Sequence, residues 1–136
     1  MSKINFNLDI YTYQIDYVGH VSNIVYVQWM EIGRTILLET IGLPLPILEK
    51  KGIAPILIHT DIKYKKALYI HNKVKCEVWI SELMNASAII NFNFFNEKNE
   101  LAAFGFQKGL FIHRDKVKPY RLTGDERKLF EKVLIK

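Results

Sequence analysis

The chain has 136 residues, a hydrophobic content of 49% and a formal net charge of +5. This length fits one ordinary domain that buries roughly two thirds of its unfolded surface, so we expect a single domain over residues 1–136. One cysteine, Cys76, excludes an intramolecular disulfide, and no apolar run reaches the roughly 18 residues of a membrane span. The first residues also lack the apolar core of a signal peptide, so we expect a cytoplasmic protein that binds no membrane.

The N-terminal part of the chain predicts one strand and one long helix. Apolar and polar residues alternate over residues 4–10, which is the period of a strand with one buried face. Over residues 24–41, two adjacent apolar stripes recur with the helical period, so this helix should be enclosed rather than lie on a surface. Gly33 would let a neighbouring backbone approach, and Gly42, Pro44 and Pro46 would end the helix.

After a loop at residues 50–52, the sequence predicts strands and no second helix until the C-terminus. The segments with the strand period are residues 56–64, 74–80, 86–94 and 101–113. Residues 96–99 have the composition of a hairpin turn between the last two. Thr123 and Glu126 have the spacing of a capping box ahead of a short amphipathic helix.

This order of elements predicts an α+β architecture. The economical arrangement is a curved antiparallel sheet of about five strands wrapped around the long central helix, with the short helix at the C-terminus. Such a sheet leaves one edge strand unprotected, and pairing between two copies would cover it. We therefore expect a homodimer or a homotetramer.

The most informative segment runs from Tyr13 to Asn23. It places one acidic residue, Asp16, a short loop before a helix start at Ser22. A carboxylate there could attack a carbonyl, or direct water at it, while free N–H groups at the helix start stabilise the charge that develops on the carbonyl oxygen. The segment therefore predicts carbonyl chemistry. The simpler structural alternative is that Asp16 only caps a helix or turn.

The same segment carries a family resemblance. Asp16-Tyr-Val-Gly19-His20-Val-Ser-Asn23, followed by Tyr26, Trp29, Glu31 and Arg34, resembles the signature of the hotdog-fold acyl-CoA thioesterases of the 4-hydroxybenzoyl-CoA thioesterase type. Many members show an Asp, two variable residues, Gly-His-Val, a polar pair, an aromatic residue and then Glu-x-x-Arg on the helix. The resemblance implies a hotdog fold and hydrolysis of acyl-CoA without a cofactor, coenzyme A being part of the substrate.

The resemblance also implies roles for individual residues. Asp16 would be the catalytic carboxylate, acting as a general base on water or as a nucleophile that forms a transient anhydride. Asn23 would supply a backbone N–H to the thioester oxygen from the first helical turn, and a further role for its side chain stays open. Gly19 would permit the tight turn. His20 would polarise the thioester or bond to nearby main chain, and Tyr17 would contact substrate.

Other residues are expected to support or line the site. Glu31 and Arg34 lie one helical turn apart and would pair with each other or brace the loop as structural support. Further candidates for lining an apolar acyl pocket between protomers are Val18, Trp29, Phe92 and Phe94. His59 and His113 have no carboxylate or cysteine at ligand spacing, so we expect no metal site.

Two groups of basic residues are candidates for holding phosphates of coenzyme A. They are Lys63, Lys65 and Lys66, and Arg114, Lys116, Lys118 and Arg121. Bacterial 4-hydroxybenzoyl-CoA enzymes carry basic residues shortly before the serine that Ser87 resembles, whereas Met84, Asn85 and Ala86 stand here. We therefore assign Lys65 and Lys66 to substrate, together with Ser87. A nucleic-acid partner would require a basic stripe with exposed aromatics or a helix-turn-helix, and neither pattern is present.

These features together predict a homo-oligomeric thioester hydrolase that converts acyl-CoA to a free acid and coenzyme A. Two alternatives remain open at this point. The first is hydrolysis of thioesters on acyl carrier protein, which a basic rim could attract. The second is a module that binds or senses acyl-CoA without catalysis, although binding alone requires no poised carboxylate.

Overall fold

The computed structural model describes residues 2–136, so Met1 of the expected domain lies outside the described residues. The elements in chain order are β1 (Ile4–Leu8), the 3-10 turn η1 (Thr12–Gln14), α1 (Asn23–Ile41), α2 (Leu45–Lys50), β2 (Ile53–Tyr64), β3 (Val74–Leu83), β4 (Ser87–Phe95), β5 (Leu101–His113), β6 (Lys116–Pro119) and α3 (Gly124–Glu131).

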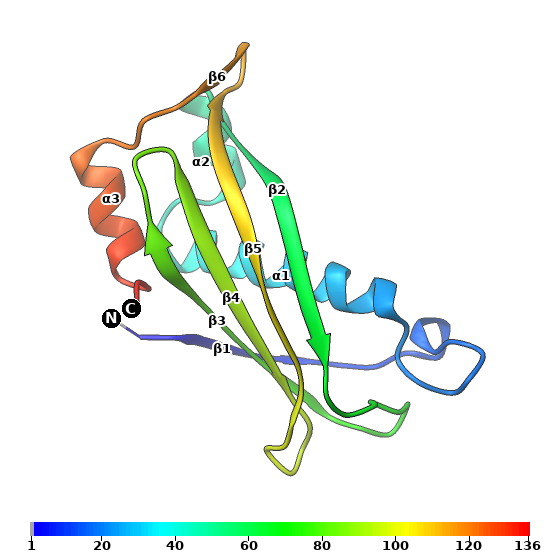
Figure 1. Cartoon of the computed structure of the whole chain (residues 1–136). Coiled ribbons are helices and arrows are strands. Elements are labelled where there is room, and N and C mark those ends of the chain that lie inside the picture. The colour runs from blue at the N-terminus through cyan, green and yellow to red at the C-terminus, as the bar shows by residue number, and fades with distance from the viewer. Residues whose placement is uncertain (1) are drawn as a thin grey trace.

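A single antiparallel sheet forms the body of the molecule. The strands lie in the order β1-β3-β4-β5-β2, and the short β6 pairs with β5. Figure 1 shows the long, twisted strands curving around α1, which runs across one face of the sheet, with α3 beside the ends of β3 and β4. The predicted curved sheet around a central helix, with a short C-terminal helix, is confirmed.

Local signals explain where α1 begins and ends. The Ser22 hydroxyl accepts a hydrogen bond from the Ile24 N–H at 3.4 Å, as an N-cap residue does. At the other end Gly42 takes the left-handed conformation, with φ of 90°, which glycine adopts without strain. Sequence therefore places both ends of the helix, since each depends on contacts within a few residues.

The core lies between α1 and the sheet. The buried residues of α1 are Val25, Tyr26, Trp29, Met30, Gly33, Leu37, Leu38 and Ile41. Each large apolar side chain buried in this way contributes about 1.5–3 kcal/mol. The expectation of a fully enclosed helix is wrong for one chain, because Ile24, Val27 and Ile32 on its outer side are exposed by 70%, 44% and 44%.

Gly33 serves packing in a way that differs from the prediction. A Cβ on this residue would lie 2.9 Å from a ring carbon of Phe92 and 3.3 Å from one of Phe6. Aromatic rings from the sheet, rather than a neighbouring backbone, therefore require the glycine.

Two elements depart from the sequence interpretation. The helix α2 follows directly on Pro44, and its second residue is Pro46. These prolines were interpreted as signals that end a helix, but proline is also tolerated in the first helical turn, where no intrahelical N–H bond is required. Strand β6 was not expected either; it has only four residues, and all of them are exposed.

The strands divide into those that follow the predicted alternation and one that does not. In β3 and β4 every second residue is buried for most of the strand, and the turn before β5 is closed by the N–H of Asn99 donating to the Asn96 carbonyl at 3.0 Å. In β2 a bulge between Leu57 and His59 breaks the pattern. Residues 55–60 of this edge strand are all exposed.

A buried carboxylate fastens α3 to the sheet region. The predicted capping box is present: the Glu126 amide donates to the Thr123 hydroxyl at 3.2 Å, and the Thr123 amide donates to the Glu126 carboxylate at 2.8 Å. The same carboxylate lies 2.9 Å from the Lys51 ammonium and accepts from the Tyr120 hydroxyl at 3.1 Å. Glu126 is 2% exposed, so this cluster replaces the solvation that the carboxylate loses.

Candidate active site

The Asp16 loop is held by main-chain hydrogen bonds before α1 begins. The Asp16 amide donates to the His20 carbonyl at 2.8 Å, and the Gly19 amide donates to the Asp16 carbonyl at 3.0 Å. Gly19 has φ of +88°, a conformation that other residues rarely adopt. The predicted role of Gly19 in a tight turn is therefore confirmed.

The carboxylate of Asp16 caps this turn with one of its oxygens. Its Oδ1 accepts hydrogen bonds from the amides of Val18 and His20, both at 3.1 Å. Within residues 2–136 no hydrogen bond engages Oδ2, and the residue is exposed. Oδ1 thus acts as a turn cap, which was the structural alternative, and Oδ2 is open to a reactant.

The start of α1 follows the loop directly. Ser22 is the N-cap, as predicted, and Asn23 is the first residue of the helix. The Asn23 N–H has no intrahelical acceptor because Asn23 is in the first helical turn, and this turn is the positive end of the helix dipole. The Val21 amide donates to the Leu68 carbonyl at 2.8 Å, which ties this helix start to the loop after β2.

A cavity of about 240 Å³ adjoins the helix start. It is lined by His20, Val21, Asn23, Tyr26, Tyr64, Lys65, Lys66, Ala67 and Leu68. The structure thus brings together four of the predicted site residues, from the loop, the helix and the end of β2. Asp16 is close in sequence to His20, which lines this cavity, but Asp16 is not itself a lining residue.

Two tyrosines of this cavity were not assigned to the site from the sequence. Tyr26 and Tyr64 meet edge to face, with ring centroids 5.2 Å apart. Burial, with a smaller effect of Tyr64, raises the pKa of Tyr26 to about 12, so its hydroxyl stays protonated at neutral pH. Tyr26 was part of the sequence signature as an aromatic position, but the contact with Tyr64 depends on the fold.

The two predicted lysines differ in their surroundings. The Lys66 ammonium forms an ion pair with Glu100, which balances its charge. The Lys65 ammonium lies 5.8 Å from the centroid of the Phe104 ring and forms no salt bridge within the described residues. Lys65 is therefore the better candidate of the two for an anionic group.

Several other predicted residues lie away from this cavity. Tyr17 is fully exposed and does not line it. His20 does line it, and its ring packs edge-on against Tyr69 at 5.2 Å rather than bonding to main chain. The proposed lining residues Trp29, Phe92 and Phe94 are at most 1% exposed. They form the core, and none of them lines a cavity described here.

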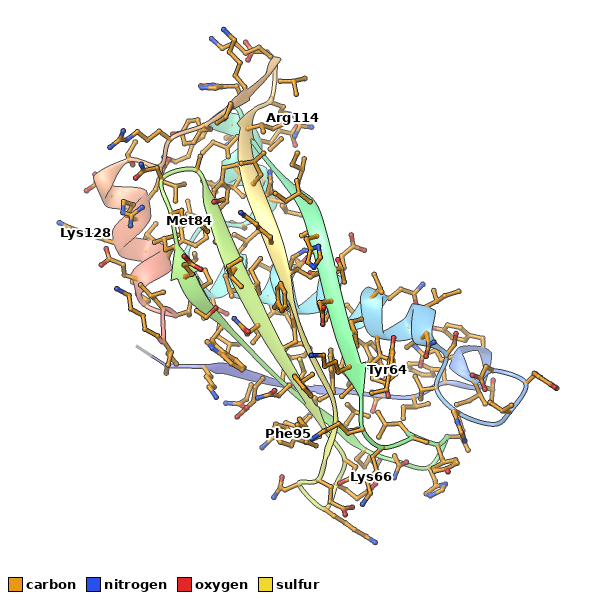
Figure 2. All side chains as sticks on the ribbon, in the orientation of Figure 1. Tyr64, Lys66, Met84, Phe95, Arg114 and Lys128 are labelled. Atoms are coloured by element: carbon orange, nitrogen blue, oxygen red, sulfur yellow. The ribbon has the colours of Figure 1, made fainter. Side chains whose placement is uncertain are left out.

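Ser87 is not part of the helix-start cavity of the same chain. Its hydroxyl donates to the Met84 sulfur at 3.5 Å, and it opens β4 opposite Leu110. Figure 2 shows Met84 at the opposite end of the sheet from Lys66. A contact of Ser87 with a substrate held at Lys65 and Lys66 would therefore require a second chain.

The predicted pairing of Glu31 and Arg34 is confirmed, at 3.7 Å. The expectation that they brace the loop is not met, because Arg34 instead donates to the side chain of Gln107 on β5. The Gln107 amide donates in turn to the Thr60 hydroxyl on β2 at 3.2 Å. Burial lowers the pKa of Arg34, and the nearby Glu31 carboxylate partly opposes this effect.

A second cavity, about 470 Å³ in volume, lies beneath the C-terminal half of α1. Its lining comprises Glu31, Arg34, Thr35, Leu37, Leu38, Leu45, Pro55, Ile56, Leu57, Ile80, Ala88, Ile90, Gly109, Phe111 and Phe130. The lining is mainly apolar, and the size is typical of sites for small molecules. Sequence did not predict this cavity.

The described residues contain neither a cluster of metal ligands nor a candidate membrane-spanning helix. Within residues 2–136, no three His, Cys, Asp or Glu side chains gather as a metal site requires. None of the helices in this range combines the length and the apolar character of a membrane span.

Comparison with known proteins gives concordant matches. The sequence model of the Thioesterase-like superfamily matches residues 10–129. A Bacillus subtilis (strain 168) protein named "Putative acyl-CoA thioesterase YneP" is 26% identical over 106 residues, covering 78% of this chain and 77% of its own. A DHNA-CoA thioesterase from Staphylococcus aureus has a TM-score of 0.90 at 26% identity, covering 98% of this chain and 91% of its own. SAV2348 from Staphylococcus aureus, solved in complex with CoA, has a TM-score of 0.90 at 12% identity, covering 99% and 87%.

Proposed function

We infer the reaction from one premise, that the chain belongs to the Thioesterase-like superfamily. It is a thioester hydrolase with a hotdog fold. The names of its relatives, an acyl-CoA thioesterase and a DHNA-CoA thioesterase, support coenzyme A as the carrier of the acyl group. We propose that the chain hydrolyses an acyl-CoA to a free acid and coenzyme A without a further cofactor.

The observation that carries the proposed mechanism is the geometry of Asp16. Two backbone amides hold its Oδ1, which fixes the carboxylate in the loop before α1 and leaves Oδ2 open. As a general base, Oδ2 would take a proton from water while the water oxygen attacks the thioester carbon. As a nucleophile, it would form an anhydride with the acyl group, which water then hydrolyses. In both routes the carbon–sulfur bond breaks, and the thiolate leaves and takes up a proton.

The start of α1 would stabilise the charge that forms on the carbonyl oxygen. The Asn23 N–H is free of intrahelical bonding and lies at the positive end of a helix of 19 residues. A donor aimed at a developing oxyanion typically contributes about a hundredfold or more to turnover. The backbone can perform this task whatever the side chain at residue 23, so the Asn23 amide is our candidate for this donor.

The proposed site requires two chains. Within one chain Asp16 does not line the large apolar cavity, which lies under the opposite half of α1. If two copies pair antiparallel along β2, the first half of β2 in one copy lies beside the second half in the other. The cavity next to Pro55 and Leu57 of one copy would then face the helix start next to Tyr64 of its partner. The acyl group would enter the cavity of one copy and react at the helix start of its partner.

The test is thiol release from short, medium, long and aromatic acyl-CoAs by the wild type and by Asp16→Asn. We expect hydrolysis of at least one thioester, with kcat/KM reduced by about a hundredfold or more in the variant, because amide nitrogen can neither accept the proton nor attack. Asp9→Asn, which changes an exposed carboxylate at the end of β1, should retain wild-type activity. Near-wild-type hydrolysis by folded Asp16→Asn would refute the assignment of Asp16.

A further inference from the structure

Arg34 gives the large apolar cavity a polar feature that hydrocarbon substrates do not need. Among the residues that line this cavity, Glu31 and Arg34 are the charged ones. The side chain of Glu31 is 74% exposed, whereas that of Arg34 is 22% exposed. The Glu31 side chain therefore faces mainly solvent, whereas the Arg34 side chain is largely covered at the wall of the cavity.

The cavity has a mouth and a floor that can be told apart by burial. The exposed lining residues are Glu31, Leu45, Pro55, Ile56 and Leu57, which come from α1, α2 and the edge strand β2. The deeply buried ones include Ile80, Ala88, Phe111 and Phe130. The cavity thus opens between the helices and β2, and its floor lies on the inner strands and α3.

Arg34 lies on the side of the cavity nearer the helix start. Its partner Gln107 precedes Gly109 and Phe111 on β5, and both of these line the cavity. The distance along a strand from residue 107 to residue 111 is about 13 Å. A ligand held beside Arg34 therefore has space for an apolar body that extends toward Phe111 and Phe130.

Protein acceptors leave part of the guanidinium unused. Nη1 donates to the Gln107 side chain, while Nη2 lies 3.7 Å from the Glu31 carboxylate, which exceeds hydrogen-bond distance. Within residues 2–136, no fully buried side-chain nitrogen or oxygen lacks a hydrogen-bond partner. Nη2, which has no hydrogen bond there, is therefore accessible to solvent or to a ligand.

We propose that this cavity receives the acyl group and that Arg34 selects acyl groups with an acceptor oxygen on the part near the mouth, such as hydroxyacyl, oxoacyl or hydroxyaroyl groups. This inference rests on the proposed function, since the ligand is the acyl part of the thioester. A plain hydrocarbon chain beside Arg34 would offer no acceptor to Nη2, while Nη1 would keep its bond to Gln107. An oxygen at this position restores a charge-assisted hydrogen bond, and the remaining carbons fill the apolar floor.

The discrimination follows from the cost of leaving the guanidinium unpaired. A site with a buried hydrogen-bond donor strongly rejects a substrate analogue that lacks the matching acceptor. An apolar pocket discriminates much less between a substrate and an analogue with one extra group. Because Arg34 is only partly buried, we expect a moderate preference of about tenfold or more in kcat/KM for an oxygenated thioester over its plain counterpart.

The experiment compares matched pairs of thioesters, hexanoyl-CoA with 3-hydroxyhexanoyl-CoA and benzoyl-CoA with 2-hydroxybenzoyl-CoA. For each pair the ratio of kcat/KM is measured in the wild type, Arg34→Met, Arg34→Lys and Lys128→Met. Methionine keeps an unbranched apolar side chain but removes every donor. Lys128 lies on the outer side of α3 and points away from the molecule, so it controls for the loss of a positive charge (Figure 2).

We expect the wild type and Lys128→Met to prefer the oxygenated member of at least one pair by about tenfold or more. The ratio should fall to about one in Arg34→Met and lie between these values in Arg34→Lys. The inference is overturned if the wild type turns over both pairs without preference, or if folded Arg34→Met keeps the full preference.

Binding of the thioesters to the Asp16→Asn protein is a second measurement. It depends neither on turnover nor on whether Arg34→Met folds. Calorimetry with the same four thioesters should show about tenfold tighter binding of an oxygenated member. Equal dissociation constants within each pair would overturn the inference. If the wild type hydrolyses no acyl-CoA but this preference in binding is present, the proposed reaction is wrong while the preference of the protein for oxygenated acyl groups stands.

Discussion

At the scale of single residues, Gly33 shows how tightly α1 packs on the sheet. A Cβ at this position would lie 2.9 Å from a ring carbon of Phe92, which is 0% exposed, so the ring or the helix would have to shift. We expect Gly33→Ala to lower the free energy of unfolding by about 1 kcal/mol, because overpacking that typically costs about 2 kcal/mol outweighs the gain of roughly 1 kcal/mol in helix propensity. Urea denaturation measures this difference.

Gly124→Ala is the matched control. Gly124 is the first residue of α3, and a Cβ there would meet nothing within 4 Å. Its free energy of unfolding should stay within about 0.5 kcal/mol of the wild type. A loss of equal size in both variants would contradict the packing argument, as would an unchanged Gly33→Ala protein.

The residues of the candidate site differ in how far sequence could identify them. Asp16, Ser22 and Asn23 lie in one continuous segment, and their turn and cap depend on hydrogen bonds within a few residues. Arg34 and Gln107 are joined across 73 positions. That contact depends on the register of β5 against α1 and β2, which local patterns do not determine.

At the scale of elements, the N-terminal cap of α3 is also a tertiary anchor with a defined pH response. Burial alone would raise the pKa of Glu126, but its hydrogen bonds with Thr123, Lys51 and Tyr120 outweigh burial and hold that pKa below its ordinary value. A carboxylate with a lowered folded-state pKa stabilises the fold above its unfolded pKa. This contribution is lost as the pH falls through the folded pKa.

We therefore expect Glu126→Gln to lower the free energy of unfolding at pH 7 by about 1–3 kcal/mol, since a neutral amide replaces three charge-assisted contacts. The difference from the wild type should begin to shrink as the pH falls below about 4.3 and vanish below the lower folded-state pKa. Denaturation series between pH 7 and pH 3 measure it. Glu131→Gln, on the exposed side of α3, should show neither effect. A constant difference down to pH 3 would contradict the argument.

Elements were predictable from sequence where one face is buried. β3, β4 and β5 alternate clearly, because one side packs on α1 and the core. β2 does not, since it lies at the sheet edge and carries a bulge after Leu57. The helix α2 was missed because proline favours the first turn of a helix but disrupts a helix interior. The contact that favours this helix is the burial of Leu48, which is 1% exposed and depends on the tertiary fold.

At the scale of the whole molecule, the architecture followed from the order of the elements, but the cavities did not. The large cavity is lined by residues of β2, β3, β4 and β5 and of all three α-helices. Its volume depends on the distance between the helices and the sheet, and the hydrophobic periodicity of the sequence does not predict that distance. The same holds for the relation between the cavity and Asp16, which depends on the proposed second chain.

The edge strand β2 is the surface at which that second chain is expected. Its residues Ile56, Leu57 and Ile58 are exposed by 38%, 38% and 53%, although they are apolar. An edge of this kind, with unpaired backbone groups and exposed apolar side chains, favours pairing with another strand. The exposed apolar residues of α1, Ile24 and Val27, lie beyond the sheet-facing stripe and would extend the contact.

We expect Ile58→Lys to convert a dimer into a monomer and to reduce hydrolysis of acyl-CoA at the same time, because the charge is placed where the second β2 would pack. The fold of each chain should persist, since the Ile58 side chain contributes little to the core of one chain. Light scattering after size exclusion gives the mass, and thiol release on the same fractions gives the activity. Val117→Lys is the matched control, because Val117 on β6 is 90% exposed. A wild type that is an active monomer, or an Ile58→Lys protein that is a monomer with full activity, would show that one chain contains the complete site.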